Sequence, residues 1–372
     1  MLKTRNLKFR IVIWKYIIFS SLIILLSCGG NRNSDQITVI DIGSNVNNWQ
    51  NVSLSSFTTD ITYIPLQIFE NNFLVGNWQG AFSGDYFLAS TMTSCLLYRK
   101  DGSFVTKIGN IGNGPGEYGG VFSSGFGPDK TIYIQSRKDL FVYNYDGTFI
   151  EKFVNGFQNE EIRNSWIALN DTLIFSRVPN RNGNEEFKAV IHTKYGRVKE
   201  AYTNYIIAPK EKITTFARNF SLVFNFKKQY YFKEMYNDTL FRLNGEFNLK
   251  PAYIFKLGKY GEPYGSFPNP NYLDYYYMHN IILTDSYVFI DLNYNKDFPG
   301  KRLTPKEIMP GLTTEYNTTQ TLGIYDITLK ELKFCMPTGT DNPLFTSGLY
   351  NDIDGGPRFF PKVIVNDNTL AM

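Results

Sequence analysis

The sequence of 372 residues predicts an all-β fold: a six-bladed β-propeller whose last blade is incomplete or closed by N-terminal strands. First, 31 Phe, 26 Tyr and 30 Gly favour aromatic-rich strands joined by many turns. Second, a strand–turn–strand phrase is centred on Gly102, Gly147, Gly196 and Gly245, at spacings of 45, 49 and 49 residues. Third, another hairpin phrase alternates strictly with it. Each pair of phrases makes four strands in just under fifty residues, which is the content of one blade.

The alternating phrase, a polar turn followed by an alternating strand, sets the number of blades. A β-sandwich with fortuitous similarity would not keep this period over four units. The Asp-Gly turns suit tight hairpins, because glycine takes positive φ without penalty. The six copies are residues 84–88, 129–134, 171–175, 228–232, 285–290 and 367–370.

The outer hairpin of the sixth blade has no counterpart in the repeat pattern. The glycine-centred phrase has a fifth copy, without glycine, at residues 323–332, and no sixth copy. A closed propeller leaves no broad exposed edge. We therefore expect Ile61–Leu66, with or without Ile37–Ile42, to supply the missing outer strands. The alternative is a reading frame truncated in its last blade.

Residues 1–27 are typical of an export signal. A basic segment precedes the apolar run Tyr16–Leu26, which is shorter than the about 20 residues that a membrane span needs. The run ends in Leu-Leu-Ser before Cys28, which resembles a bacterial lipobox. We therefore expect lipidation and cleavage at Cys28, with acyl chains as the membrane anchor and residues 28–36 as a flexible tether.

Composition narrows the function classes. The net charge of +4 comes from the export signal, because 38 Lys and Arg less the five in residues 1–27 leave 33 against 34 Asp and Glu. A near-neutral chain gives no electrostatic reason to expect nucleic-acid binding. Cys95 and Cys335 lie in different repeats and are expected to be buried free thiols. His192 and His279 are expected to be structural.

Three motifs resemble hallmarks of a known family. They are Gly109–Tyr118 (GNIGNGPGEY), Asn237–Leu243 (NDTLFRL) and Asn351–Pro357 (NDIDGGP), and their order matches. The family is the six-bladed β-propeller lipoproteins of Bacteroidetes, with the NHL/YWTD-like architecture, and the resemblance covers roughly residues 37–372. It implies one propeller domain, secreted and anchored to the outer membrane by lipid, of largely uncharacterised function. Members usually continue through the outer strands of the last blade, and no catalytic residues come with the resemblance.

The glycine-rich loop Gly109–Gly120 invites comparison with a phosphate-binding loop. It lacks the Gly-Lys-Ser/Thr ending and follows a strand without opening a helix. A tight crossing between blades, where only glycine permits close backbone approach, explains it better. Glu117 and Tyr118 are candidate ligand-binding residues at the rim.

Two long insertions, residues 258–277 and 295–319, interrupt the repeats, and loops of this length are often functional. The first is rich in aromatic residues that could stack against sugar rings or peptide side chains, or pack at a blade interface. The second is polar and basic, as expected for a solvated loop. The candidate ligand-binding tyrosines in the first are Tyr264, Tyr272, Tyr275 and Tyr276.

One loop carries the oxygen ligands that calcium prefers. Asn351–Gly356 contains Asp352 and Asp354 beside two glycines, but it lacks the twelve-residue pattern and terminal Glu of a calcium-binding loop. A structural turn is the simpler interpretation. If calcium binds, Asp352 and Asp354 are its first candidates; no other cofactor is predicted.

Two functions from different classes fit these observations. The first is a monomeric, lipid-anchored binding or scaffold module in the cell envelope that presents its faces to a glycan, peptide or protein partner. The alternative is a metal-dependent propeller lyase or a lactonase/esterase-like hydrolase with a metal at the central channel. The two histidines stand at non-equivalent repeat positions, which counts against the alternative.

Overall fold

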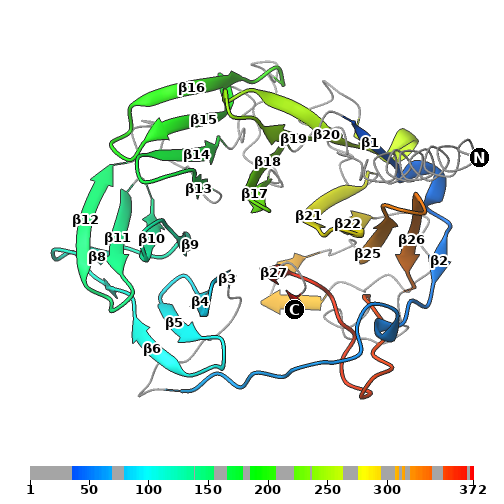
Figure 1. The fold of residues 1–372 in the computed structure, drawn as a ribbon, viewed down its shortest axis with the longest axis horizontal. Helices are drawn as coiled ribbons and strands as arrows, with labels where there is room; N and C mark the ends of the chain where they lie inside the picture. The colour runs from blue at the N-terminus through cyan, green and yellow to red at the C-terminus, as the bar shows by residue number, and fades with distance from the viewer. Residues whose placement is uncertain are drawn as a thin grey trace, which may run out of the picture. The chain divides into compact units, whose positions relative to one another are not determined.

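A computed structural model shows an all-β propeller in which five blades are arranged in a ring (Figure 1). The chain divides after Thr38, and the propeller is the unit Val39–Met372. The structure describes residues 36–68, 79–137, 139–154, 166–178, 185–206, 222–234, 237–262, 275–294, 306–309, 312–314, 319–336, 347–366 and 369–372.

Each blade is an antiparallel meander of four strands in chain order, from the inner strand outward, except that a hairpin is inserted in the fifth. This agrees with the two alternating hairpin phrases. Blade 1 contains β3 (Gln79–Ser83), β4 (Tyr86–Ser90), β5 (Cys95–Arg99) and β6 (Phe104–Lys107). Blade 2 contains β9 (Ser123–Phe126), β10 (Thr131–Ser136), β11 (Asp139–Asn144) and β12 (Phe149–Val154). Blade 3 contains β13 (Trp166–Ala168), β14 (Leu173–Arg177), β15 (Phe187–Thr193) and β16 (Val198–Thr203). Blade 4 contains β17 (Leu222–Phe226), β18 (Gln229–Lys233), β19 (Thr239–Leu243) and β20 (Leu249–Lys256). Blade 5 contains β21 (Tyr277–Leu283), β22 (Tyr287–Tyr294), β25 (Thr319–Asp326) and β26 (Glu331–Cys335).

Between blades 5 and 1 lies a two-stranded sheet made of β27 (Val363–Asn366) and β28 (Thr369–Ala371) (Figure 1). Its second strand, β28, contains the last two residues of the sixth copy of the polar-turn phrase. Leu370 packs in the same apolar cluster as Phe289 of blade 5, and β27 contacts β3 of blade 1. The hairpin therefore occupies a sixth position in the ring.

Two further short strand pairs lie outside the blade sheets. A parallel pair, β7 (Asn110–Ile111) and β8 (Glu117–Tyr118), lies in the glycine-rich loop between blades 1 and 2. The hairpin β23 (Lys306–Met309) and β24 (Leu312–Thr314) lies in the insertion between β22 and β25.

The outer turns form for the reason that the sequence suggested. Gly102, Gly147 and Gly196 adopt φ of 87°, 84° and 82°, a region that residues with a Cβ atom rarely adopt. Asp101 Oδ1 accepts a hydrogen bond from the Ser103 amide at 2.9 Å, and Asp146 Oδ1 accepts the equivalent bond from the Thr148 amide at 2.8 Å in the next blade. Each Asp therefore fixes the turn that its glycine permits.

The core lies between neighbouring blades, because successive residues of a strand point to opposite faces of its sheet. In the second strands, the third residue packs against the following blade: Leu88 clusters with Ile132 of blade 2, and Phe175 meets Phe232 of blade 4 with ring centroids 6.0 Å apart. Cys95 and Cys335 are buried free thiols, as predicted. Burial raises the pKa of each thiol to about 12, so neither is a ready nucleophile.

The N-terminal strands do not extend the sixth position, so that prediction for Ile37–Ile42 is wrong. β1 (Thr38–Asp41) adds a fifth strand beside β20 of blade 4, and β2 (Trp49–Gln50) pairs in parallel with β26 of blade 5. The reason is apolar burial, because Ile40 and Ile42 are fully buried in the cluster formed by blades 4 and 5. The 3₁₀ turns η1 (Gly43–Asn45) and η4 (Gly258–Tyr260) lie against each other at this corner.

Residues 53–68 continue past the sixth position to blade 1, without forming the strand predicted at Ile61–Leu66. Ser53 bridges Tyr350, and the 3₁₀ turn η2 (Leu54–Ser56) follows. At the far end, the Gln67 amide donates to the Gly102 carbonyl at 2.9 Å. The segment is extended but does not pair as a strand, and Pro65 has no amide hydrogen to donate.

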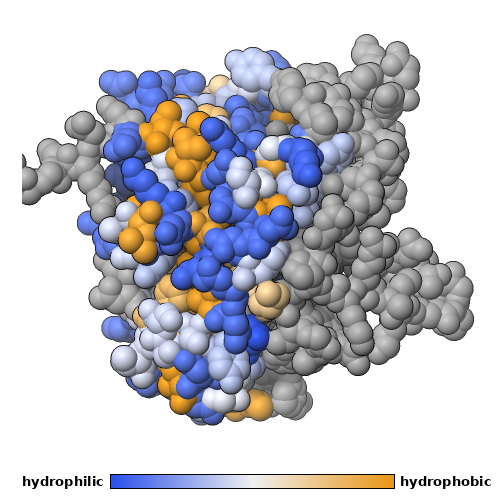
Figure 2. All heavy atoms as spheres, turned by 90° about the vertical axis from the view of Figure 1, so that its right-hand side faces the viewer, coloured by the Kyte–Doolittle hydropathy of each residue, from blue (hydrophilic) through white to orange (hydrophobic). Residues whose placement is uncertain are grey.

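We call Val39–Ile68 the N-terminal belt, because it passes blade 4, blade 5, the sixth position and blade 1 in turn (Figure 1). Figure 2 faces the side of the ring where β1, β2, β20 and β26 lie, and there the surface mixes hydrophobic with hydrophilic residues. Val39 of β1 is an exposed apolar residue of the belt.

Candidate functional site

A polar side chain is buried at the same place in each of the five blades. It is the fifth residue of the second strand, and each is at most 6% exposed. The five are Ser90, Gln135, Arg177, Lys233 and Asp291. Counting from the first strand residue after each polar turn would have revealed this position in the sequence.

These residues make polar contacts where their strands end. Ser124 Oγ of blade 2 donates to Ser90 Oγ of blade 1 at 2.9 Å. Asp291 of blade 5 accepts from Gln320 Nε2 at 2.6 Å and forms an ion pair with Lys362 Nζ, just before β27, at 3.3 Å. Hydrogen bonding compensates the cost of burying polar groups at the blade interfaces. The charged members occur in blades 3, 4 and 5, so this half of the ring is chemically different from blades 1 and 2.

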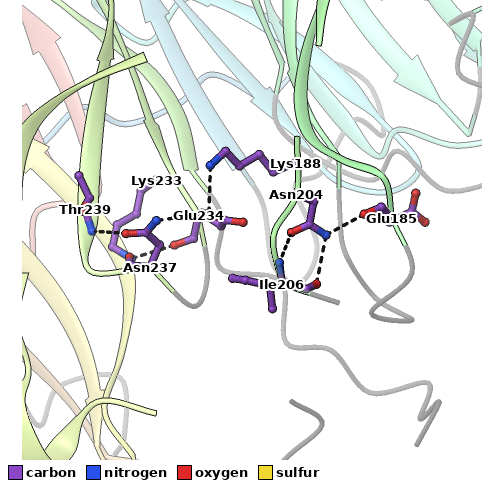
Figure 3. Close-up of polar contacts among 8 residues, drawn as sticks. All are labelled: Glu185, Lys188, Asn204, Ile206, Lys233, Glu234, Asn237 and Thr239. Carbon is purple, nitrogen blue, oxygen red and sulfur yellow. Dashed lines mark hydrogen bonds and ion pairs between the residues drawn. The ribbon is translucent and has the colours of Figure 1, made fainter. Parts of the chain in front are cut away.

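A cavity of about 420 Å³ lies beside this charged half, between blades 3 and 4. Its walls come from the start of β15 and from segments that follow β16, β18 and β20 or precede β19, so it lies at the ring face where second and third strands connect. Figure 3 shows part of this region. The lining residues are Lys188, Tyr205, Ile206, Glu234, Asn237, Asp238 and Glu262.

Lys188 reaches across the blade interface because of a β-bulge. The pairing of β15 with β16 slips between Phe187 and Ala189, which leaves Lys188 as the extra residue. A bulge re-aims the side chain it carries. Lys188 Nζ lies 3.5 Å from Glu234 Oε2 of blade 4, and the two side chains are 14% and 11% exposed (Figure 3). The same ammonium lies over the ring of Phe241, 5.4 Å from its centroid.

Lys233 holds the loop that forms the opposite wall. Its Nζ donates to the carbonyl oxygens of Glu234 at 3.0 Å and Asn237 at 2.8 Å. Asn237 Oδ1 in turn accepts from the Thr239 amide at 2.9 Å, which fixes the start of β19 (Figure 3). The motif NDTLFRL therefore has a structural role in shaping this wall, as well as contributing Asn237 and Asp238 to the lining.

Two titratable groups at this wall are perturbed. Burial lowers the pKa of Lys233 to about 8, although Asp238 and Glu234 act in the opposite direction. Burial raises the pKa of Asp238, while the nearby Lys233 lowers it. Perturbed groups beside a cavity are typical of functional sites.

Asn204 fixes the segment that carries the aromatic side of the cavity. Its Nδ2 donates to the Glu185 carbonyl at 2.8 Å and its Oδ1 accepts from the Ile206 amide at 2.9 Å (Figure 3). Tyr205, between these anchored residues, is 72% exposed. The structure therefore presents an aromatic ring at the cavity on a segment that is held at both ends.

The aromatic insertion contributes to the site in a way that the sequence did not indicate. Glu262 lines the cavity, and its Oε2 accepts a hydrogen bond from Tyr277 Oη at 3.0 Å. Tyr276 is buried and stacks on Tyr260 with centroids 4.6 Å apart, so it is a packing residue and not a surface contact. Tyr275 is half-buried and does not line the cavity. The other two predicted tyrosines, Tyr264 and Tyr272, lie outside the described residues.

The glycine-rich loop is a close crossing, and the prediction for Tyr118 as a rim residue is wrong. Tyr118 is fully buried and its Oη donates to the Ile108 carbonyl at 2.6 Å. Glu117 is half-buried, and its Oε2 accepts from the Gly114 amide at 2.8 Å. Gly109, with φ of 61°, leaves no space for a Cβ atom beside the rings of Tyr118 and Tyr143. This loop lies between blades 1 and 2, away from the cavity.

Asp352 and Asp354 are exposed and fasten the belt to the loop at the sixth position. Asp352 Oδ1 accepts from the Ser55 amide at 3.0 Å, and these contacts lower the pKa of its carboxyl group. Asp354 Oδ1 accepts from Asn351 Nδ2 at 2.7 Å and from the Gly356 amide at 2.9 Å. Among the described residues, no three His, Cys, Asp or Glu side chains are grouped so that they could hold a metal ion. The structure thus gives both aspartates roles in loop geometry.

Two further predictions concern the histidines and the N-terminus. His192 is buried, its Nε2 is 2.9 Å from Ser176 Oγ, and its Nδ1 is 2.8 Å from the Thr193 carbonyl. Burial lowers its pKa, as expected for a structural histidine. Cys28 and the export signal lie outside the described residues. In the part of the chain that the structure describes, no helix is long and apolar enough to cross a membrane.

Comparisons with known proteins agree with the fold. Residues 37–372 match a domain of unknown function, DUF4934. A crystal structure of a Bacteroides fragilis protein assigned as exported is similar, with 18% identity, a TM-score of 0.56, and 80% of each chain covered.

Weaker similarities are seen to two other solved structures. A DUF4221 family member from Bacteroides vulgatus has 12% identity and a TM-score of 0.43, with 73% of this chain and 83% of that chain covered. The virginiamycin B lyase of Staphylococcus aureus has 11% identity and a TM-score of 0.39, with 71% and 84% covered. No curated protein matches the chain in sequence.

Proposed function

Because this chain belongs to the DUF4934 family, whose description assigns no activity, we propose a function from its own residues: a binding module that takes a glycan in the cavity between blades 3 and 4. The observation that carries the proposal is the composition of that cavity. It combines carboxylates, an amide and an ammonium group with an exposed tyrosine ring.

The chemistry of these groups matches that of a sugar. Carboxylate and amide oxygens accept hydrogen bonds from hydroxyl groups, and the Asn237 amide and the Lys188 ammonium donate them. The Tyr205 ring offers an apolar face with a polar end, as ligand-contacting aromatic residues do. The volume of about 420 Å³ falls in the range of about 300–1,000 Å³ that is usual for small-molecule sites. A peptide or protein partner remains the other class of ligand for such a module.

The proposed location is the cell envelope, with the acyl chains of Cys28 as anchor. The lipobox-like residues that end at Cys28 support it, as does the similarity to an exported Bacteroides protein. Each buried methylene of an acyl chain contributes about 0.8 kcal/mol to membrane affinity, so multiple chains hold a soluble domain firmly. Cys28→Ala should abolish membrane partitioning or maturation. If the variant still pellets with membranes, the proposed anchor is wrong.

We also propose that the ring counts as six blades, with β27 and β28 as the inner hairpin of the sixth. The place of this hairpin between blades 5 and 1 supports this count, and so does the sixth copy of the polar-turn phrase. The belt would then close the outer side of that position, where Ser53, Leu54 and Tyr63 contact residues 349–354.

A glycan array probed with the detergent-solubilised full chain tests the proposed function. We expect binding to a defined set of glycans, lost in Tyr205→Ala and retained in Tyr195→Ala. Tyr195 is a matched control because it is 70% exposed, lies under a lysine as Tyr205 does, and stands at the other end of β16. An array without binding, or equal losses in both variants, would contradict the proposal.

The alternative function, a lyase or hydrolase, draws on one observation: the opposite pKa shifts of Lys233 and Asp238 beside the cavity. Lys233 Nζ donates to two loop carbonyls, however, which is a structural role. Turnover of a glycan that binds on the array would favour the enzyme.

A further inference from the structure

The glycine-rich loop presents an asparagine directly before a glycine at the surface. Asn113 and Gly114 are both exposed, in the bend between the paired strands β7 and β8. In such a dipeptide the backbone nitrogen of the glycine can attack the side-chain amide of the asparagine, because the reaction closes a five-membered ring. Glycine has no Cβ atom to hinder this approach. The loop, which lies away from the cavity, therefore carries a chemical reactivity of its own.

A carboxylate lies on the nitrogen that would attack. Glu117 Oε2 accepts a hydrogen bond from the Gly114 amide at 2.8 Å, and the Gly114 carbonyl accepts one from the Glu117 amide at 3.0 Å. These two bonds hold the carboxylate in place. A Cβ atom at Gly112 would overlap it, so the loop leaves space for it only because that residue is glycine. A carboxylate at this distance from a proton can remove it as a general base.

A second asparagine–glycine pair, Asn244–Gly245 in the outer turn of blade 4, provides a comparison within the same chain. Asn244 Oδ1 accepts hydrogen bonds from the Glu246 amide at 3.0 Å and the Asn248 amide at 2.7 Å. These bonds fix the side chain, whereas ring closure requires it to rotate toward the next backbone nitrogen. The fold should therefore protect Asn244 and leave the exposed Asn113 reactive.

We propose that Asn113 is a site of self-modification by deamidation, with Glu117 as the base. The Gly114 nitrogen loses its proton to Glu117 and forms a bond to Asn113 Cγ. The Cγ–Nδ2 bond breaks, and the side-chain nitrogen leaves as ammonia with the proton that Glu117 returns. Water then opens the cyclic imide at either carbonyl group, which gives aspartate or its β-linked isomer. The net reaction consumes one water molecule and requires no oxidant or reductant.

The products change the crossing between blades 1 and 2. Both add a negative charge close to Glu117, and the β-linked isomer also lengthens the backbone by one atom. The Gly112 amide donates to the Tyr118 carbonyl at 3.1 Å, so the extra atom falls inside a closed loop. Tyr143 Oη of blade 2 donates to the Gly116 carbonyl of the same loop at 2.6 Å. The modification therefore acts on a segment that joins two blades.

Peptide mass mapping of the folded, detergent-solubilised full chain tests the proposal. The chain is incubated at neutral pH and physiological temperature in water enriched in oxygen-18, which labels each residue that converts during the incubation. We expect Asn113 to convert at least about tenfold faster than Asn244 in the folded chain. In urea the two rates should agree within about threefold, because the protection of Asn244 depends on the fold.

Glu117→Gln tests the role of the base, because it keeps an oxygen that can accept the Gly114 hydrogen bond and removes the basic group. The variant should slow the conversion of Asn113 at least about threefold. A loop that was merely loosened would convert faster, so the direction of the change separates loss of the base from loss of structure. Glu246→Gln is the matched control, because Glu246 is exposed in the outer turn of blade 4, and it should leave the rate at Asn113 unchanged.

Each outcome decides a part of the proposal. An Asn113 that does not convert, or that converts no faster than Asn244 in the folded chain, overturns the modification site. An unchanged or faster conversion in Glu117→Gln overturns the assignment of Glu117 as the base. Conversion that is faster at Asn113 and slowed in Glu117→Gln supports both parts. None of these results depends on glycan binding, so the test is independent of the proposed function.

Discussion

Removing the side chain of Ile40 should weaken the whole propeller, although β1 is remote in sequence from the strands that it covers. Ile40 is fully buried among residues of blades 4 and 5. Ile→Ala substitutions in such positions cost about 2–5 kcal/mol, because a cavity replaces the lost side chain. We therefore expect Ile40→Ala to lower the free energy of unfolding by this amount.

Thermal unfolding provides the assay. At about 2.1 cal/mol/K per residue, the unit Val39–Met372 unfolds with an entropy of about 0.7 kcal/mol/K. A loss of about 2–5 kcal/mol then lowers the midpoint by about 3–7 °C. Scanning calorimetry of the detergent-solubilised chain resolves a shift of this size.

The neighbouring residue supplies the control. Val39 is in the same strand, is 43% exposed and points away from the core, so Val39→Ala should change stability by no more than about 0.5 kcal/mol. Equal shifts for the two variants, or no shift for Ile40→Ala, would refute the conclusion that the belt is an integral part of the propeller.

Three further predictions test the ion pair, the turns and the buried lysine. Lys188→Met leaves Glu234 buried without its ion-pair partner and should lower the free energy of unfolding in urea by about 3–5 kcal/mol. The double variant Lys188→Met/Glu234→Gln should restore most of this loss. A double variant that is less stable than either single variant would argue against the ion pair. Gly84 has a φ of 56° and open space around it, so Gly84→Ala should lower the free energy of unfolding by about 1 kcal/mol. Gly102→Ala should lower it clearly more, because the new Cβ atom would collide with the belt. Similar losses for the two variants would contradict this. The pKa of Lys233 is about 8 in the folded state and about 10.5 in the unfolded chain, so the unfolded chain binds more protons between these values. The free energy of unfolding should therefore rise between about pH 8 and 9.5, relative to that of Lys233→Met. Parallel pH profiles for the two proteins would contradict this.

The repeat pattern predicted the blades because the residues that form each turn lie close together in the sequence. A glycine such as Gly102 and an acceptor such as Asp101 define an outer turn without reference to the rest of the chain. The belt could not be predicted in the same way. Ile40 and Ile42 are apolar enough to pair with any blade edge, and their place beside β20 depends on the shape of a core formed by residues of blades 4 and 5, which follow much later in the chain.

Most of the candidate site could not be predicted from the sequence, for a related reason. The sequence drew attention to the glycine-rich loop and the aromatic insertion, and the structure buries Tyr118 and Tyr276. The cavity depends on Lys188, whose direction is set by a one-residue bulge that leaves no mark in composition or spacing. In the sequence, Asn237 and Asp238 stand out only as part of the motif Asn237–Leu243. The fifth position of the second strands was visible in principle, since Arg177, Lys233 and Asp291 interrupt otherwise apolar strands.

Mapping where a ligand touches the chain tests whether it occupies the cavity between blades 3 and 4. The glycan that binds most tightly on the array is prepared with a photoactivatable diazirine and crosslinked to the full chain, and the modified residues are identified by mass spectrometry. We expect crosslinks at Tyr205, Ile206 or Glu262 that the unmodified glycan competes away. Competed crosslinks confined to the outer turns at Gly102, Gly147 and Gly196, at the opposite end of the blades, would contradict it.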